Sequence, residues 1–224
     1  MSILDAVDPE RTRDLRFGTV DSWIVWRLTD VAHHVADGSN AGLGGLLDSD
    51  CAGPDTRVLE RRRIPERMLP TVVDSSGAIG EATALPGAPV ICGIAGDQQA
   101  SLIGQACVHP GMAKITFGTG AFALAIAGTH RIDGSRFGIL PTVAWKIGKD
   151  APSFALDGGV YNAASAVNWA RGLGLFSDYN ELAKFDSDAA ILRHLAFVPA
   201  LSGLACPHWD RNAAGLWIGM GLDT

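Results

Sequence analysis

Residues 93–99 (GIAGDQQ) place a carboxylate, Asp97, between an apolar run and a stretch with helical spacing. A carboxylate at the end of a strand and the start of a helix can accept a proton from a substrate hydroxyl, which is general-base chemistry. The same position suits a helix N-cap, whose side chain accepts hydrogen bonds from free backbone N–H groups. Position alone favours the cap, although Ala100 stands where a capping box would need Glu or Gln.

A second segment, residues 117–122 (FGTGAF), could bind phosphate. Glycines let backbone N–H groups approach phosphate oxygens closely, and the hydroxyl of Thr119 adds a donor. The alternative is a tight hairpin turn that needs glycine for positive φ.

The same segment matches Gly-x-Gly-x-x-Ala, one form of the dinucleotide-binding fingerprint. The residues after Gly120 alternate with the period of a strand rather than a helix, and no acidic residue follows about 20 positions on. Both observations argue against a dehydrogenase.

Apolar periodicity predicts the elements that position these segments. We expect helices at residues 19–29, 55–62, 98–106 and up to 172, with a short one opening at Pro65. Strands are expected at residues 89–94, 138–145, 153–156 and 196–201, and residues 112–117 and 121–127 form the two arms of a hairpin.

Finer expectations concern a helix cap, the burial of two elements and the residues of the last helix. Asp21 or Ser22 would cap the first helix. The strand at residues 89–94 would be buried, and Leu102, Ile103 and Ala106 would form the apolar stripe of the following helix. Val160, together with Ala164, Val167 and Arg171, would lie on the helix that runs to Gly172.

The composition indicates a folded α/β protein. Of 224 residues, 47% are hydrophobic, 19% are charged and 27 are Gly. A net charge of −6 argues against a nucleic-acid partner, because a duplex binder usually has a clustered basic surface.

Features that the sequence lacks exclude further classes of protein. No apolar stretch of about 18 residues could span a membrane, and the chain turns acidic directly after Met1, so we expect a cytoplasmic protein without a signal peptide. The four Cys form no CxxC pair, the six His have no metal-ligand spacing, and there is no P-loop or nucleophile elbow.

Four segments in order resemble the glycerol kinase branch of the FGGY carbohydrate kinases. They are residues 17–23 (FGTVDSW), 93–100 (GIAGDQQA), 117–120 (FGTG) and 199–209 (PALSGLACPHW). The GDQQ sequence is the specific part, because relatives that act on sugars usually carry another residue pair after the aspartate.

This resemblance implies an α/β, ribonuclease H-like fold of the actin and hexokinase type, present in part and spanning parts of two domains. Residues 1–108 would be the C-terminal part of the substrate domain, and residues 109–224 the first half of the nucleotide domain. Substrate and nucleotide would meet in the cleft between them. The implied activity is ATP-dependent phosphorylation of glycerol to glycerol 3-phosphate, with Mg²⁺ as cofactor.

The resemblance also assigns site residues. Asp97 would be the general base, and Gln98 and Phe122 would line the polyol site. The nucleotide would be bound by Gly118, Thr119, Gly120, Ala164 and Asn168, the last two standing where the family has glycine and glutamine. No residue of the chain is assigned to a metal.

Residues 39–56 match the family poorly, and several of its site segments have no counterpart in this sequence. We therefore expect the polypeptide alone to be inactive, and exposed apolar surface to favour a homo-oligomer. Two alternatives stay open: a kinase of another polyol or sugar, and a non-catalytic binding module.

Overall fold

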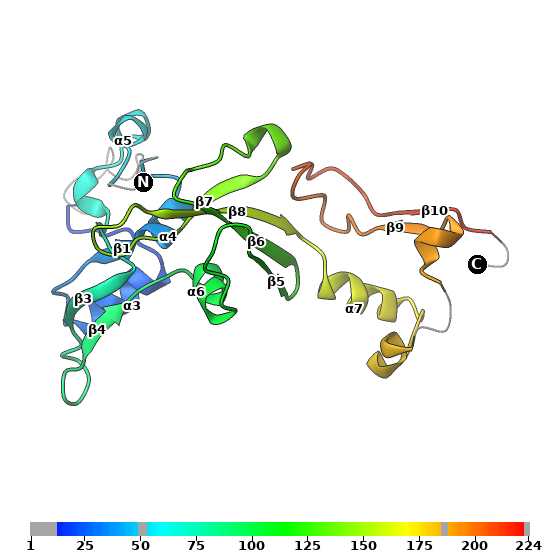
Figure 1. Ribbon diagram of the computed structural model, residues 1–224, viewed down its shortest axis with the longest axis horizontal. Coiled ribbons are helices and arrows are strands. Elements are labelled where there is room, and N and C mark those ends of the chain that lie inside the picture. Colours follow the sequence, from blue (N-terminus) through cyan, green and yellow to red (C-terminus); the bar gives the residue numbers. More distant parts are fainter. Residues whose placement is uncertain (1–12, 49–52, 185–187, 222–224) are drawn as a thin grey trace. The chain divides into compact units, whose positions relative to one another are not determined.

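The computed structural model describes residues 13–48, 53–184 and 188–221 (Figure 1). These residues divide into two compact units. The first unit holds the described residues up to Met112 together with Ala125–Ile132 and Pro141–Leu156. The second unit holds Ala113–Leu124, Asp133–Leu140 and the described residues from Asp157 onward.

The first unit combines short helices with two-stranded sheets. Its helices are α3 (Val20–Leu28), α4 (Gly38–Leu43), α5 (Thr56–Arg62), the 3₁₀ helix η1 (Glu66–Met68) and α6 (Asp97–Gly104). Strand β1 (Val35–Asp37) pairs in parallel with β2 (Thr71–Val73). Strand β3 (Ser76–Glu81) pairs antiparallel with β4 (Val90–Gly93), with an irregularity between Ser76 and Gly80.

Among the described residues, two apolar clusters lie in the core of this unit. Val25 of α3, Val35 of β1 and Ile94 are buried together, and Val73, Ile79 and Ile91 pack against them. Val143 and Phe154 form the second cluster, with Leu47 and Ala127. The first cluster joins α3, β1 and the residue that follows β4, so it fixes where the chain enters α6.

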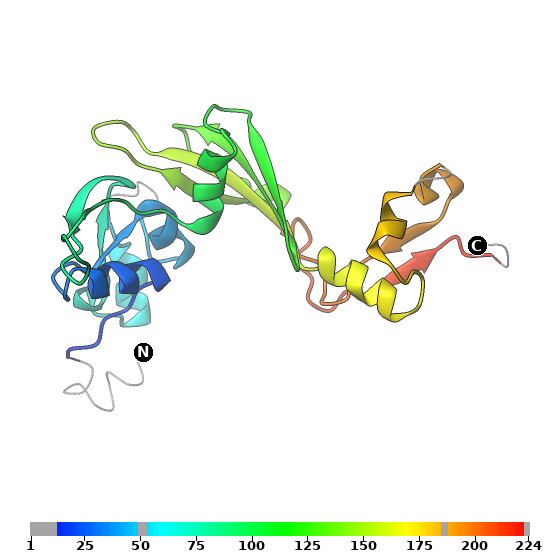
Figure 2. The same cartoon turned by 90° about the horizontal axis from the view of Figure 1, so that it is seen from below.

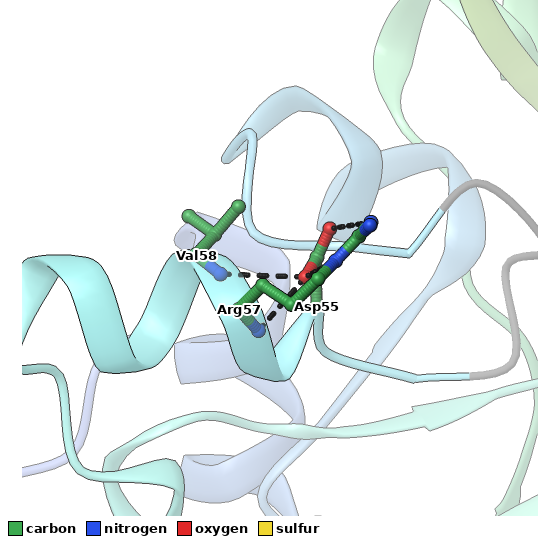
Figure 3. Close-up of polar contacts among 3 residues, drawn as sticks. All are labelled: Asp55, Arg57 and Val58. Carbon is green, nitrogen blue, oxygen red and sulfur yellow. Dashed lines mark hydrogen bonds and ion pairs between the residues drawn. The ribbon is translucent and has the colours of Figure 1, made fainter.

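The start of α5 shows how an aspartate caps a helix in this protein (Figure 3). Asp55 accepts hydrogen bonds from the backbone N–H groups of Arg57, at 2.9 Å, and Val58, at 3.3 Å. The Arg57 guanidinium donates to the same carboxylate at 3.2 and 3.0 Å. The side-chain bond from Arg57 holds the pKa of Asp55 below its ordinary value.

The cap of α3 differs from the sequence expectation. The N-cap is Thr19, and its side chain makes no capping hydrogen bond. Asp21 lies inside the first turn, where its carboxylate accepts from the amide of Asn40 at 2.6 Å. Ser22 is buried. The prediction that Asp21 or Ser22 caps this helix was wrong because both residues lie inside the first turn, where Ser22 contacts the Thr19 hydroxyl and Asp21 contacts Thr19 and Asn40.

Four strands form one sheet in the order β5-β6-β8-β7. They are β5 (Ala113–Phe117), β6 (Ala121–Gly128), β7 (Leu140–Trp145) and β8 (Ser153–Val160). Figure 2 shows β5 and β6 as the two arms of a hairpin, which confirms that prediction. Val160 ends β8, so it lies outside the helix in which the sequence placed it.

The second unit contains one α-helix among its described residues, α7 (Ala164–Gly172). Short 3₁₀ helices η2 (Ser135–Phe137), η3 (Tyr179–Ala183) and η4 (Ala190–Arg193) accompany it, and β9 (Ala196–Val198) pairs antiparallel with β10 (Leu216–Ile218). Phe197 stacks between Trp169 and Trp217, with ring centroids 5.4 and 4.3 Å apart. This stack joins α7 to the β9–β10 pair.

Two burial expectations were wrong. Strand β4 exists, but Val90, Cys92 and Gly93 are exposed, because a two-stranded sheet covers its apolar side chains incompletely. In α6 Leu102 is buried, whereas Ile103 and Ala106 are exposed. The helix instead turns Gln99 inward with Leu102.

No helix among the described residues combines the length and apolar character needed to cross a membrane.

Candidate active site

Asp97 is the first residue of α6, directly after β4 and a three-residue connection. The N-cap is Gly96, which has no side chain, so Asp97 is not itself the cap. One carboxylate oxygen, Oδ1, accepts the N–H of Gln98 at 2.7 Å. Oδ2 has no hydrogen-bond partner among the residues described by the structure. The side chain is exposed, so Oδ2 is free to accept a proton from a bound hydroxyl.

The backbone before Asp97 is tightly confined. Gly96 is buried, and its N–H donates to the Ser39 hydroxyl at 2.8 Å. A Cβ at this position would lie 2.5 Å from Oε1 of Gln99. Glycine therefore lets the chain pass between Ser39 and Gln99 as α6 begins.

Gln98 and Gln99 have different surroundings. Gln98 is half-buried. Gln99 is 2% exposed, and its amide nitrogen donates to the Val143 carbonyl at 3.3 Å. Gln99 thus ties α6 to β7 inside the first unit, which leaves Gln98 as the amide beside Asp97 that a ligand could reach.

The Gly118–Thr119–Gly120 loop lies at the tip of the β5–β6 hairpin in the second unit. The Thr119 carbonyl accepts from the N–H of Ala163 at 2.8 Å and from the N–H and hydroxyl of Ser165 at 3.2 and 2.9 Å. The Thr119 hydroxyl is exposed and has no hydrogen-bond partner within the described residues. The loop is therefore held by its backbone, while its side-chain donor faces solvent.

The two glycines of this loop serve different purposes. Neither has a positive φ, so the interpretation that the turn needs glycine for φ was wrong. A Cβ on Gly120 would lie 2.5 Å from the Val160 carbonyl oxygen, whereas a Cβ on Gly118 would come no nearer than 3.8 Å to its surroundings. Gly120 is required by the close approach of two backbones.

Ala164 and Asn168 lie one turn apart on the exposed face of α7. The N–H of Ala164 donates to the Gly118 carbonyl at 3.0 Å, so this end of the helix is bonded to the loop. Asn168 accepts from the Tyr179 hydroxyl at 2.5 Å. Its short side chain is already oriented by that bond.

Phe122 follows the loop on β6, is 43% exposed, and packs against Gly159 of β8. Phe122, the loop and the α7 residues therefore belong to the second unit, whereas Asp97 and Gln98 belong to the first.

Asp157 of β8 is a half-buried acid in the second unit that the sequence analysis did not single out as a site residue. Burial raises its pKa, and the positive charge of Lys114 opposes that rise. Lys114 is itself buried and donates to the Thr116 hydroxyl at 2.7 Å. In the sequence, the available sign of such a half-buried acid is that Asp157 lies in the run that forms strand β8.

We searched the described part of the chain for side chains that could together hold a metal ion. No group of three or more His, Cys, Asp or Glu side chains comes together there. The assignment of no metal ligand from the sequence stays a prediction.

Family models match both parts of the chain. The N-terminal domain of the FGGY family of carbohydrate kinases matches residues 4–104, and the C-terminal domain of the same family matches residues 113–224. The predicted boundary between residues 108 and 109 stays a prediction.

Relatives point to the same family. The chain is 42% identical to a glycerol kinase from Alkalilimnicola ehrlichii, with 99% of this chain and 46% of the relative aligned. It is 41% identical to a glycerol kinase from Geobacter sp., with 97% and 45% aligned. The chain thus spans about half the length of the curated relatives it matches.

Solved structures agree. A Plasmodium falciparum glycerol kinase with ADP superposes with a TM-score of 0.86 at 28% identity, covering 99% of this chain and 46% of that one. A gluconate kinase from Lactobacillus acidophilus gives 0.75 at 25% identity, covering 90% and 42%. The fold is accordingly ribonuclease H-like, of the actin and hexokinase type, as the sequence predicted, and the chain belongs to the FGGY family of carbohydrate kinases.

Proposed function

We propose that this chain carries the general base and phosphate-binding loop of an ATP-dependent glycerol kinase. The observation that carries the proposal is the exposed Asp97 carboxylate with Oδ2 free at the start of α6. Identity of 41–42% to glycerol kinases supports glycerol as the substrate.

The reaction assigns Asp97 a proton-transfer role. As the substrate oxygen attacks the γ-phosphorus of ATP, the carboxylate takes the hydroxyl proton. The bond from the γ-phosphorus to the bridging oxygen breaks, and ADP leaves. Gln98 would donate or accept at a second hydroxyl, and Phe122 would cover the carbon backbone of the polyol.

The second unit would hold the nucleotide. Thr119 offers a free hydroxyl, and Gly118 and Gly120 leave room for phosphate oxygens beside the backbone. Ala164 and Asn168, on the exposed face of α7, would contact the rest of ATP. Mg²⁺ would enter with the nucleotide as part of the substrate.

The deciding experiment measures ADP release with MgATP and glycerol. Because the chain spans about half the length of its relatives, the assay is run on the chain and on a chimera that supplies the remainder from the Geobacter sp. enzyme. In the active form, Asp97→Asn should lower kcat about 10³-fold, within the range for removal of a general base.

Asp55→Asn is the matched control. Asp55 also accepts N–H groups from the first turn of a helix, but at α5, and its substitution should leave kcat unchanged. Equal turnover in the Asp97→Asn and control variants would reject Asp97 as the base.

A second candidate is a kinase of another polyol or sugar, which the structural match to a gluconate kinase favours. A panel of glycerol, gluconate and xylulose separates the two by kcat/KM. If the chain binds neither nucleotide nor polyol and the chimera is inactive, the non-catalytic binding module is left.

We also propose a cytoplasmic, self-associating protein. Apolar residues on one face of α3, Val20, Trp23 and Ile24, are exposed, and such a face favours association. Light scattering of the purified chain tests the oligomer, and cell fractionation tests the location.

A further inference from the structure

Asp37, at the end of β1, is a completely buried carboxylate in the first unit. Oδ1 accepts from the Ser39 hydroxyl at 2.8 Å and from the N–H of Asn40 at 3.2 Å. Oδ2 accepts from the Ser75 hydroxyl at 2.6 Å. No ion pair to Asp37 exists within the described residues. A buried carboxylate without a cation depends on such donors, so both oxygens hold their partners strongly.

The two serines bonded to Asp37 also hold the segment that leads into α6. The Ser39 hydroxyl accepts the N–H of Gly96 at 2.8 Å. The Ser75 carbonyl accepts the N–H of Ile94 at 3.0 Å. One carboxylate therefore links the residues that bond both ends of the 94–96 segment, and Asp97 follows directly.

The directions of the hydrogen bonds allow Ser39 to bond Asp37 and Gly96 at the same time. Ser39 donates its only hydroxyl proton to Asp37, so its oxygen lone pairs face the Gly96 N–H. The carboxylate charge polarises the hydroxyl and strengthens the bond from Gly96. The Gly96 carbonyl then accepts the N–H of Ala100 at 2.8 Å, the first hydrogen bond of α6.

We propose that Asp37, acting through Ser39 and Ser75, is a positioning residue for Asp97. It sets the start of α6 and thereby the place of the Asp97 carboxylate, without touching substrate. This inference rests on the proposed role of Asp97 as the base.

The test compares two buried hydroxyls of the same kind in the full chain. Ser39 donates to Asp37 and accepts the Gly96 N–H. Thr29, 3% exposed, donates to the Val25 carbonyl at 2.8 Å and accepts the His33 N–H at 3.1 Å. Ser39→Ala and Thr29→Val each remove one donor and one acceptor, so both should lower the melting temperature.

The first readout is amide hydrogen exchange. Ser39→Ala should speed exchange at Gly96, and at Ala100 whose N–H is bonded to the Gly96 carbonyl, about tenfold, whereas Thr29→Val should leave these amides unchanged. Equal exchange at Gly96 and Ala100 in both variants would overturn the proposal that Ser39 holds the start of α6. If Ser39→Ala does not fold, Asp37→Asn, which keeps an oxygen for Ser39 and Asn40, gives the same comparison.

The second readout is the split between kcat and KM in the form of the protein whose ADP release depends on Asp97. Ser39→Ala should lower kcat about tenfold with KM for ATP unchanged, because only the base is displaced. Unchanged kcat, or an equal loss in Thr29→Val, would overturn the positioning role. Failure of the proposed function can be told apart from failure of this inference. Asp97→Asn would then have no effect on ADP release, while the exchange result would still report whether Ser39 holds the start of α6.

Discussion

The two loops assigned to catalysis are anchored by buried polar side chains of different chemistry. In the first unit, the approach to Asp97 depends on Asp37, a carboxylate that accepts from two hydroxyls and one N–H. In the second unit, Asn162 precedes α7 and accepts from the Ser202 hydroxyl at 3.2 Å, and it shares the single hydroxyl proton of Ser165, at 3.1 Å, with the Thr119 carbonyl. Ser165 in turn donates its N–H to the Thr119 carbonyl.

The difference lies in what each anchor leaves unpaired. A carboxylate only accepts, so donors alone satisfy Asp37. An amide also carries two donor hydrogens, and Nδ2 of Asn162 is buried without a partner among the described residues. An acceptor-only anchor therefore suits a site surrounded by hydroxyls, whereas an amide there carries donor hydrogens that lose their partners.

The largest effect is expected from Asp37→Ala. Three buried donors would lose their acceptor together, so the free energy of unfolding should fall by about 3 kcal/mol or more, as judged by urea denaturation. Asp55→Ala is the control, because Asp55 also caps a helix but is partly exposed, and water can replace its bonds (Figure 3). A loss no greater than that of the control would contradict the role of Asp37 as a buried anchor.

The next effect compares the glycines of the two loops. In Gly120→Ala the new Cβ meets the Val160 carbonyl, a backbone atom that cannot yield, and stability should fall by about 2 kcal/mol. In Gly96→Ala it meets Oε1 of Gln99, a side-chain atom that can shift at the cost of the bond to the Val143 carbonyl, so we expect a smaller loss. Gly118→Ala, with open space, should be nearly neutral. Equal melting temperatures for the alanine variants of Gly118 and Gly120 would refute this order.

A smaller effect is expected from Asn162→Ala. The Ser202 hydroxyl loses its acceptor and the Ser165 hydroxyl keeps the Thr119 carbonyl, while the unpaired Nδ2 disappears as well, so the net loss should be about 1 kcal/mol. Urea denaturation beside the Asp37→Ala variant checks the comparison directly. An equal or larger loss for Asn162→Ala would show that Nδ2 is well satisfied.

The smallest effect concerns pH, and the two units should respond in opposite directions. Burial lowers the pKa of His34 in the first unit, from an ordinary value of 6.5, although its bond with the Phe17 backbone opposes this. The unfolded chain then binds more protons, so stability falls as pH drops through 6.5 toward the folded pKa. Burial raises the pKa of Asp157 in the second unit above 3.8, so the folded chain binds more protons, and stability rises as pH drops through the folded pKa toward 3.8.

His34→Asn and Asp157→Asn remove these contributions one at a time. We would plot the urea midpoint of each variant against pH from about pH 4 to about pH 8. Each variant should lose the slope that its own substituted group causes and keep the slope of the other group. The same slope in both variants and the unsubstituted chain would contradict the assignment.

Local patterns in the sequence predicted several elements, but they missed α4, the short strands β1, β2, β3 and β10, and the long-range partners of all elements. The hairpin around residues 118–120 and the helix after Asp97 follow from alternation, glycines and helical spacing, and the structure confirms both. Apolar spacing could not show that Gln99, rather than Ile103, turns inward, because the reason is a bond to Val143, 44 residues away.

The anchors escaped prediction for the same reason. Ser39 lies 57 residues before Gly96, and Ser75 lies 38 residues after Asp37, so no local periodicity connects them. A cluster of small polar residues directly after a strand, such as Asp37, Ser39 and Asn40, was the one available signal, and it indicates only a helix cap. The roles of Asp97, Gln98 and Phe122 came from resemblance and stay predictions.

The Thr119 carbonyl, fixed by donors from Ala163 and Ser165, has a consequence for transplanting this loop. Because a peptide unit is planar, a carbonyl aimed at the start of α7 turns the N–H of Gly120 the opposite way. The shape of the tip is therefore encoded outside it. Moving residues 118–120 alone to another hairpin would lose that orientation, whereas a graft that carries residues 160–165 with them should keep it.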